Sequence, residues 1–147
     1  MYRKILVPID GSEGSSRALD HLLRMLENEK AENVVLLHAA NYPTQLEPYS
    51  GKMGTTMLKV REQLKEHGEE VLLQAKDLIT AKIPAQAVET KLVWGDPKYE
   101  IVDEADAGNY DLLVIGSRGL SGIKGFLLGS VGSHVARHVK CTVILVK

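Results

Sequence analysis

The chain has 147 residues, 44% of them hydrophobic and 25% charged, so we expect a single domain over residues 1–147 with a substantial core. Every apolar stretch is shorter than the roughly 18 residues of a membrane-spanning helix, and we expect no secretion signal after Met1. Its one cysteine, Cys141, excludes an intramolecular disulfide and a multi-cysteine metal cluster. These features predict a cytoplasmic protein without membrane or nucleic-acid partners.

The net charge of −1 conceals an uneven distribution. Residues 1–111 carry 13 Lys and Arg against 19 Asp and Glu, a balance of −6, and no acidic residue follows. The five basic residues after this point are Arg118, Lys124, Arg137, Lys140 and Lys147. An acid-free basic segment favours an anionic ligand there, although a strand and a helix without acids also account for it.

In the first part of the chain, an apolar run at 5–9 predicts a strand, followed by a turn at Asp10-Gly11-Ser12. Apolar side chains at helical spacing predict a helix over 15–29. A second apolar run predicts a strand over 34–40. The stretch 41–54 contains two prolines and two glycines and therefore predicts a loop.

A longer amphipathic pattern predicts a second helix over 55–82. The next strand is predicted over 85–94, where apolar and polar residues alternate. A third helix is expected to follow, because Asp96 is a good N-cap and Pro97 suits the first helical position. This helix is predicted to end near Gly108.

The last third contains the most informative pattern. An apolar strand predicted at 112–115 runs into Gly116-Ser117-Arg118-Gly119, and after nine residues into Gly129-Ser130 and a helix predicted over 131–138. Glycine lets a backbone approach an anion closely, and the free N–H groups of a helix N-terminus attract negative charge. The pattern therefore predicts a phosphate-binding loop.

Five strands that alternate with four helices predict an α/β fold with a parallel sheet and helices on both faces. The first, second and fourth strands are almost continuously apolar, which is typical of central strands. The alternating third strand and the short last strand, Thr142–Val146, are expected at the two edges. An uncovered apolar edge pairs readily with a second copy, so we predict a homodimer through Thr142–Val146; a covering loop or helix is the alternative.

If the first and fourth strands are central neighbours, their outgoing connections diverge and leave a crevice for a ligand. The acidic turn at Asp10 would repel phosphate, whereas Arg118 and Lys124 would attract it. A nucleotide suits this polarity, with its phosphates across the loop that ends at Ser130. Asp10 either contacts the ligand or a divalent ion, or only shapes the turn and caps a helix. Ser130 is either a helix cap or a phosphate contact.

Several common sites are excluded, since the chain has no P-loop, no dinucleotide-binding glycine motif and no metalloprotease or serine-hydrolase signature. His134 and His138 have the i, i+4 spacing of a metal-binding pair, but a solvated helix face is the favoured interpretation. His38, near the end of the second strand, is expected to be hydrogen-bonded or to line a pocket.

These patterns together resemble the universal stress protein family over essentially the whole chain. The resemblance rests on residues 5–12, 36–38, 93–97 and 111–116. The most specific part is the motif G-2x-G-9x-G-[S/T], which marks the ATP-binding branch of the family. It is matched here by Gly116, Gly119, Gly129 and Ser130.

The resemblance implies an adenine nucleotide alpha hydrolase-like fold with sheet order 3-2-1-4-5, bound ATP or AMP with Mg²⁺, and dimers through the last strand. The residues implied around the adenosine are Pro8, Ile9, Asp10, Ala39 and Ile115. Those implied at the ribose and phosphates are Gly116, Arg118, Gly119, Gly129, Ser130 and Val131. Many members have Ser or Thr where this chain has Gly132, so one hydroxyl donor is expected to be missing.

The function expected from this resemblance is that of an ATP-binding, homodimeric stress sensor or regulator with at most slow ATP hydrolysis. One alternative is a metal-assisted nucleotide hydrolase in which Asp10 or His38 positions water. Another is an interaction module in which the bound nucleotide is structural.

Overall fold

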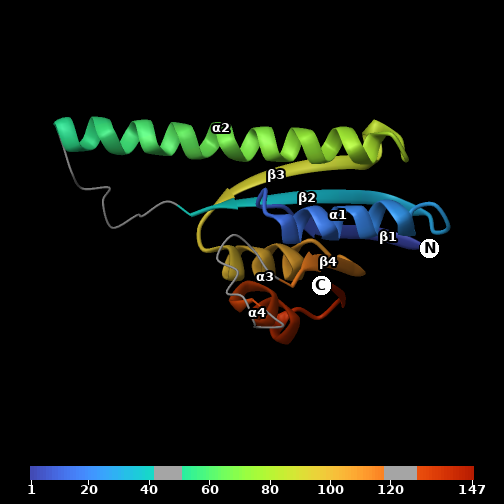
Figure 1. Cartoon of the computed structure of the whole chain (residues 1–147). Helices are drawn as coiled ribbons and strands as arrows, with labels where there is room; N and C mark the ends of the chain where they lie inside the picture. The colour runs from blue at the N-terminus through green and yellow to red at the C-terminus, as the bar shows by residue number, and fades with distance from the viewer. Residues whose placement is uncertain (42–50, 118–128) are drawn as a thin grey trace.

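The computed structural model describes residues 1–41, 51–117 and 129–147 (Figure 1). The elements in chain order are β1 (Tyr2–Pro8), α1 (Glu13–Met25), β2 (Ala31–Ala40), α2 (Lys52–Thr80), a short 3₁₀ turn (Ala85–Ala87), β3 (Val88–Trp94), α3 (Pro97–Ala107), β4 (Leu112–Gly116), α4 (Ser130–His138) and β5 (Thr142–Val146).

The strands form a parallel sheet in the order β3-β2-β1-β4-β5. Helices α1 and α2 cover one face, and α3 and α4 cover the other (Figure 1). The predicted α/β fold, the strand order and the two edge strands are thereby confirmed. This arrangement buries the central strands on both faces, which explains why their sequences are almost continuously apolar.

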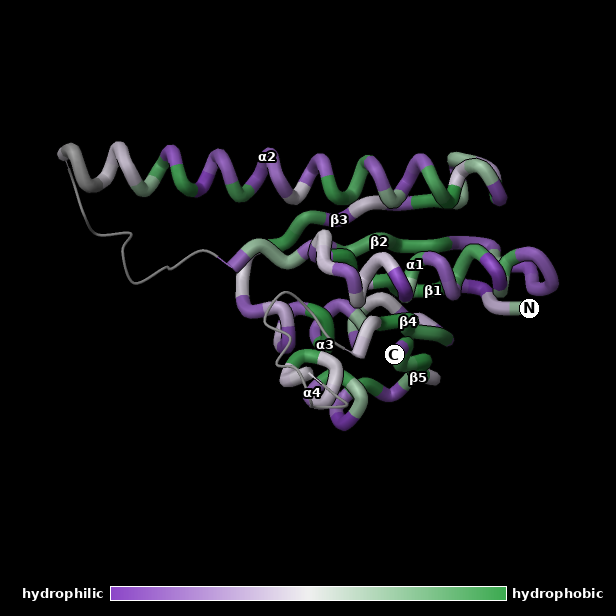
Figure 2. Tube along the Cα trace, viewed as in Figure 1, coloured by the Kyte–Doolittle hydropathy of each residue, from purple (hydrophilic) through white to green (hydrophobic). Residues whose placement is uncertain are grey.

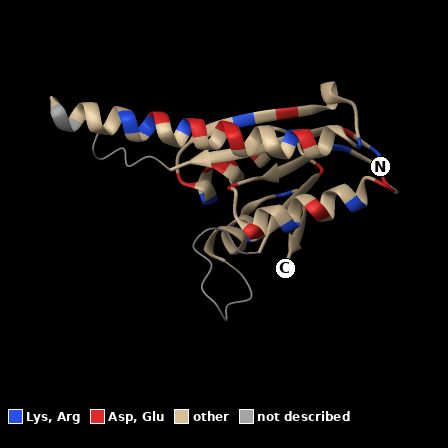
Figure 3. Cartoon of the chain, turned by 45° about the horizontal axis from the view of Figure 1, so that its top comes forward, with Lys and Arg blue, Asp and Glu red and all other residues tan. Residues whose placement is uncertain are grey.

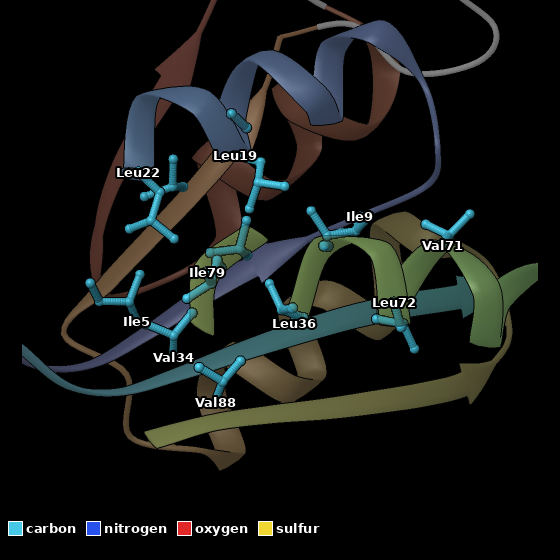
Figure 4. Packing of buried hydrophobic residues seen from close by; sticks show 14 of the residues in the cluster. Ile5, Ile9, Leu19, Leu22, Val34, Leu36, Val71, Leu72, Ile79 and Val88 are labelled. Carbon is cyan, nitrogen blue, oxygen red and sulfur yellow. The ribbon is translucent and has the colours of Figure 1, made fainter. Parts of the chain in front are cut away.

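Alternate residues of each central strand supply two separate cores. Ile5 and Val7 of β1 pack with α1 and α2, whereas Leu6 packs with α3 and α4. All three are fully buried, and Figures 2 and 4 show the apolar strands and the packing under α1 and α2. Burying one such side chain contributes about 1.5–3 kcal/mol. The two cores therefore hold the sheet between its helical layers.

Two strand boundaries differ from those predicted by hydropathy. β1 begins at Tyr2, because Tyr2 and Lys4 already pair with β2 although they are not part of the apolar run. The residues Ala85–Ala87 form a 3₁₀ turn, closed by the Ala87 N–H on the Pro84 carbonyl at 2.9 Å, so the predicted strand start at Ala85 was wrong. Main-chain hydrogen bonds set the starts of both strands, and these bonds cannot be inferred from the polarity of the side chains.

Helix α1 begins at Glu13, two residues before the predicted start, because Ser12 caps it. The Ser12 hydroxyl oxygen accepts a hydrogen bond from the Ser15 N–H at 3.2 Å. Helix α2 begins at Lys52, so the predicted end of the loop at Gly54 was wrong. The rest of that predicted loop, residues 42–50, lies outside the described residues.

A partly buried carboxylate links β3, α3 and the start of β4. Glu104 Oε1 accepts hydrogen bonds from Lys91 Nζ at 2.8 Å and from the Tyr110 hydroxyl at 2.5 Å. Burial on its own raises the pKa of Glu104, but these two bonds outweigh it and leave the pKa below its usual value.

By contrast, the charged side chains along α2 lie mostly on its exposed side (Figure 3).

We expect Glu104→Gln to lower the free energy of unfolding at pH 7 by about 1–3 kcal/mol, because a buried charged acceptor is lost. A carboxylate with a lowered pKa stabilises the fold above its unfolded pKa of about 4.3, and this contribution disappears as the pH falls through the folded pKa. Urea unfolding at pH 7 and pH 3 should therefore show a difference from wild type that shrinks in acid.

The matched control is Glu27→Gln, since Glu27 pairs with Lys82 on the surface, where the two side chains are 55% and 41% exposed. That variant should cost less than about 1 kcal/mol. Equal losses in the two variants would contradict the role assigned to Glu104.

Candidate functional site

The sheet has its topological switch point between β1 and β4, which are neighbours at its centre. The chain leaves β1 toward α1 on one face and leaves β4 toward α4 on the other (Figure 1). In open parallel sheets ligands bind outside the carboxyl ends of the strands at such a point. The connections that leave β1 and β4 therefore run to opposite faces of the sheet, as expected from the sequence.

Side-chain alternation divides the predicted adenosine residues between the two faces. Ile115 packs with α3 and α4, and the alternation of a strand places Pro8 and Ala39 on that face as well. The side chain of Ile9 lies on the opposite face, in the same cluster as Val71 of α2 (Figure 4). Ile9 therefore presents only its main chain to the other side of the sheet.

Asp10 follows β1 and shapes the turn that leads into α1. Its Oδ1 accepts a hydrogen bond from the Ser12 N–H at 2.9 Å, and Asp10 is only partly buried. The turn-shaping role is thus confirmed, whereas the helix cap is Ser12 and not Asp10. Ser12 is 7% exposed, and a serine directly before the first helical turn is the sequence signal that could have found this cap.

Gly116 ends β4 directly against the first turn of α1. A Cβ added at Gly116 would lie 2.4 Å from the carbonyl oxygen of Gly14 and 2.5 Å from its carbonyl carbon. No side chain fits at that distance, so glycine is required here by the packing of α1 on β4. The sequence pattern had indicated only an approach to an anion, and the contact with Gly14 was not foreseen.

Ser117 connects the end of β4 to both β5 and α4. Its N–H donates to the Val146 carbonyl at 2.8 Å, and its own carbonyl accepts from the Gly129 N–H at 2.5 Å. Ser117 is 2% exposed. The glycine motif accepts any residue at this position and so did not predict the contacts of Ser117, although a place directly after a central strand could have indicated a fixed backbone.

Helix α4 begins at Ser130, and its N-cap is Gly129, with an extended backbone at φ −69° and ψ 164°. The interpretation of Ser130 as the helix cap is therefore wrong, and the other interpretation, a phosphate contact, stays a prediction. In the described part of the chain no side chain caps this helix, and its first turn carries no acidic residue. Among the described residues, the first N–H groups of α4 therefore have no side-chain partner, and they carry the partial positive charge of a helix N-terminus.

Gly132 lies on the side of α4 that packs on the sheet. A Cβ added there would be 3.4 Å from the Gly116 carbonyl oxygen, 3.4 Å from Leu145 Cδ2 and 3.6 Å from the Ser117 carbonyl oxygen. A side chain at this position points toward the end of β4. The hydroxyl that many family members were expected to carry here would therefore lie beside main-chain carbonyls.

His38 is buried on the face covered by α2. Its Nδ1 donates to the Ile9 carbonyl at 2.7 Å, and the residue is 7% exposed. The ring also packs closely on Gly68, where an added Cβ would be 2.6 Å from His38 Cδ2. The predicted hydrogen-bonded histidine is confirmed.

The predicted site residues Arg118 and Gly119 lie outside the described residues, as does Lys124. Within 1–41, 51–117 and 129–147, no three His, Cys, Asp or Glu side chains are grouped closely enough to hold a metal ion. No helix in those same ranges has the length and apolarity required to cross a bilayer.

The sheet order defines a doubly wound α/β protein, and the N-terminus of α4 at its switch point is a candidate anion site. The model of the universal stress protein family matches residues 1–147, and the chain belongs to this family. The universal stress protein YxiE of Bacillus subtilis is 32% identical, with all of both chains covered.

Two solved structures extend the comparison. MJ0577 of Methanocaldococcus jannaschii has a TM-score of 0.80 at 29% identity, with 100% of this chain and 96% of that chain covered. A crystal structure of a universal stress protein in complex with cAMP has a TM-score of 0.71 at 30% identity, with 99% and 97% covered.

The two glycines that face the end of β4 should respond differently to alanine. Gly116→Ala should lower the free energy of unfolding by about 1–3 kcal/mol or more, because its Cβ collides with the backbone of α1. Gly132→Ala should be neutral or stabilising by up to about 1 kcal/mol, since its Cβ meets ordinary contacts and alanine favours the helix. Urea unfolding of ligand-free protein measures both, and similar effects would contradict this assignment.

Proposed function

We propose that this chain is an adenine-nucleotide-binding regulator, a homodimeric stress sensor of the cytoplasm with at most slow ATP hydrolysis. The observation that carries the proposal is the N-terminus of α4 at the switch point of the sheet, which has no acidic residue in its first turn and no side-chain cap among the described residues. A whole-length relative of known structure, 30% identical, binds cAMP, which is also an adenine nucleotide.

The phosphates would bind at the start of α4. The N–H groups of Ser130 and Val131 belong to the first turn, where a helix accepts anions. Gly129, the N-cap, has no side chain that could compete with a phosphate for these N–H groups. Arg118 and Gly119 complete the proposed phosphate contacts, in the acid-free part of the sequence.

The adenosine would lie over the carboxyl ends of the central strands. Pro8, Ala39 and Ile115 offer apolar side chains on the face of α3 and α4, and Gly116 adds main-chain contacts. Asp10 uses Oδ1 in its turn, which leaves its other oxygen to accept a hydrogen bond from a ribose or base.

ATP or AMP fits this proposal, with Mg²⁺ as the counterion of the phosphates. Mg²⁺ keeps several waters and takes one or two carboxylates in addition to phosphate oxygens. Asp10 can supply one such carboxylate, and its partial exposure allows this. When bound, the ion would neutralise phosphate charge.

The slow hydrolysis follows from how the two candidate bases are held. Asp10 accepts the Ser12 N–H, and the Nδ1–H of His38 is bound to the Ile9 carbonyl on the α2 face. His38 therefore lies away from the start of α4, and the free oxygen of Asp10 would serve as a ligand of the nucleotide or of Mg²⁺ rather than as a base. A regulatory protein needs only differential binding of the nucleotide, not turnover.

Substitution of Ser130 separates phosphate binding from folding. Ser130→Asp should lower the affinity for Mg-ATP by about 10-fold or more, because a carboxylate joins the phosphate-binding turn. The same change should leave thermal stability equal or higher, since an acidic residue suits a helix N-terminus. Isothermal titration calorimetry and circular dichroism measure the two effects.

Ser130→Ala is the matched control, because it removes the exposed hydroxyl and adds no charge. This variant should bind Mg-ATP almost as tightly as the wild type, since the proposed contacts are main-chain N–H groups. Equal affinities for the wild type and the aspartate variant would exclude phosphates from the start of α4.

The proposed homodimer forms through β5. This strand, Thr142–Val146, is an edge of the sheet, and its residues are exposed or half-buried. An open edge of apolar residues pairs with an identical edge around a two-fold axis. Because Ser117 is bonded to Val146, such pairing would also brace the end of β4.

Light scattering should give a mass close to twice the 16.1 kDa of one chain. Thr142→Lys should shift the mass toward the monomer, because it sets like charges against each other at the shared edge. Thr90→Lys, at an exposed threonine of the opposite edge strand β3, should leave the mass unchanged. A wild-type monomer, or a dimer lost only with Thr90→Lys, would rule out pairing through β5.

A further inference from the structure

His38 of β2 is a buried histidine beside the proposed nucleotide site, and none of the proposed contacts uses its side chain. Its Nδ1 lies 2.7 Å from the carbonyl oxygen of Ile9. A carbonyl only accepts hydrogen bonds, so Nδ1 carries the proton and donates. Ile9 and the next residue of β2, Ala39, are both among the residues expected around the adenosine. The imidazole is therefore bonded to the main chain of the site itself.

This bond takes the place of the next main-chain bond between β1 and β2. Pro8 and Leu37 are the last pair in the register of the two strands, and the Ile9 N–H still donates to the Leu37 carbonyl at 2.8 Å. If the parallel ladder continued, the Ile9 carbonyl would accept the Ala39 N–H. Among the described residues, the imidazole of His38 is its donor instead. Ile9 is thus held by β2 at both its N–H and its carbonyl.

The bond also sets the direction of the peptide between Ile9 and Asp10. The described chain has no cis peptide bond, so this carbonyl and the N–H that follows it point in opposite directions. Because the Ile9 carbonyl points to β2, the Asp10 N–H points to the other neighbour of β1, which is β4. In the described register, β1 and β4 pair no further than Leu6 and Leu113. The Asp10 N–H therefore lies outside that ladder and faces the switch point.

A glycine inside α2 makes room for this histidine. Gly68 lies in the interior of the helix, where glycine is less favourable than alanine. A Cβ added at Gly68 would lie 2.6 Å from His38 Cδ2 and 2.7 Å from Leu92 Cδ1. The ring thus occupies the space that a side chain of α2 would need. This close packing restrains the imidazole in the orientation that bonds Ile9.

We propose that His38 is a positioning residue of the nucleotide site. It holds the Ile9 carbonyl, and through that peptide it sets the direction of the Asp10 N–H and the start of the turn that carries the Asp10 carboxylate. A donor that is fixed before the ligand arrives does not have to be ordered on binding, and this raises the affinity. The inference rests on the proposed function, because the ligand that gains is the adenine nucleotide.

Calorimetric titration of the full chain with Mg-ATP tests this role. His38→Leu keeps an apolar side chain in the buried position but removes the donor, so the affinity should fall by about 10-fold or more. His38→Asn offers an amide N–H in place of Nδ1–H and should bind within about threefold of the wild type. Packing alone would give the reverse order, since leucine fills a buried position better than the smaller, polar asparagine.

Gly68→Ala reaches the same ring from α2 without changing β2. Its methyl group would displace the imidazole, whereas alanine itself favours the helix, so the variant should fold. Its affinity for Mg-ATP should fall by about threefold or more, because the bond to Ile9 is disturbed. This variant tests the proposal even if His38→Leu does not fold.

His67→Leu is the matched control. His67 meets the His38 ring edge to face from an exposed position of α2, with centroids 6.2 Å apart, and its replacement leaves the bond to Ile9 in place. This variant should bind Mg-ATP as the wild type does.

Wild-type affinity in His38→Leu or in Gly68→Ala would overturn the positioning role and leave the proposed function in place. Weaker binding by His38→Asn than by His38→Leu, or equal losses in His38→Leu and His67→Leu, would assign the effect to packing and overturn it as well. A wild type that does not bind Mg-ATP would instead overturn the proposed function, and this inference with it.

Discussion

The contact of two glycine backbones at the centre of the molecule sets the geometry of the whole switch point. Gly116 and Gly14 approach so closely that a methyl group at Gly116 fits only if the backbone shifts. This approach places the first turn of α1 against the end of β4. Ser117, the residue after β4, then forms main-chain hydrogen bonds with Val146 of β5 and with Gly129. The start of α4 is therefore positioned by a continuous series of main-chain contacts.

That fixed backbone explains how a site can be built from few polar side chains. The N–H groups of Ser130 and Val131 owe their donor capacity to helix geometry, and no side chain of the described residues caps them. The acid-free end of the chain keeps negative charge away from them. A site of this kind suits binding and release of a polyphosphate, while Asp10 and His38 remain engaged in the structural contacts of the strand ends.

The fold could be predicted from sequence because burial leaves a direct mark on it: strands covered on both faces are continuously apolar, and the glycine motif lies at the switch point. Contacts between backbone atoms of distant residues do not produce a pattern of this kind in the sequence. The hydrogen bonds of Ser117 to Val146 and Gly129 and the close approach of Gly116 to Gly14 both depend on residues that are neighbours only in the fold. The stacked rings of His134 and His138 were visible only as a spacing, which a solvated helix face shares.

The central claim is that main-chain N–H groups at the start of α4 hold the phosphates of an adenine nucleotide. A crystal structure of the wild-type chain grown with excess Mg-ATP tests it most directly. We expect phosphate oxygens about 3 Å from the amide nitrogens of Ser130 and Val131, with the adenine over the ends of β1 and β4. A nucleotide bound elsewhere, or a helix end covered by protein side chains under saturating ATP, would contradict the account.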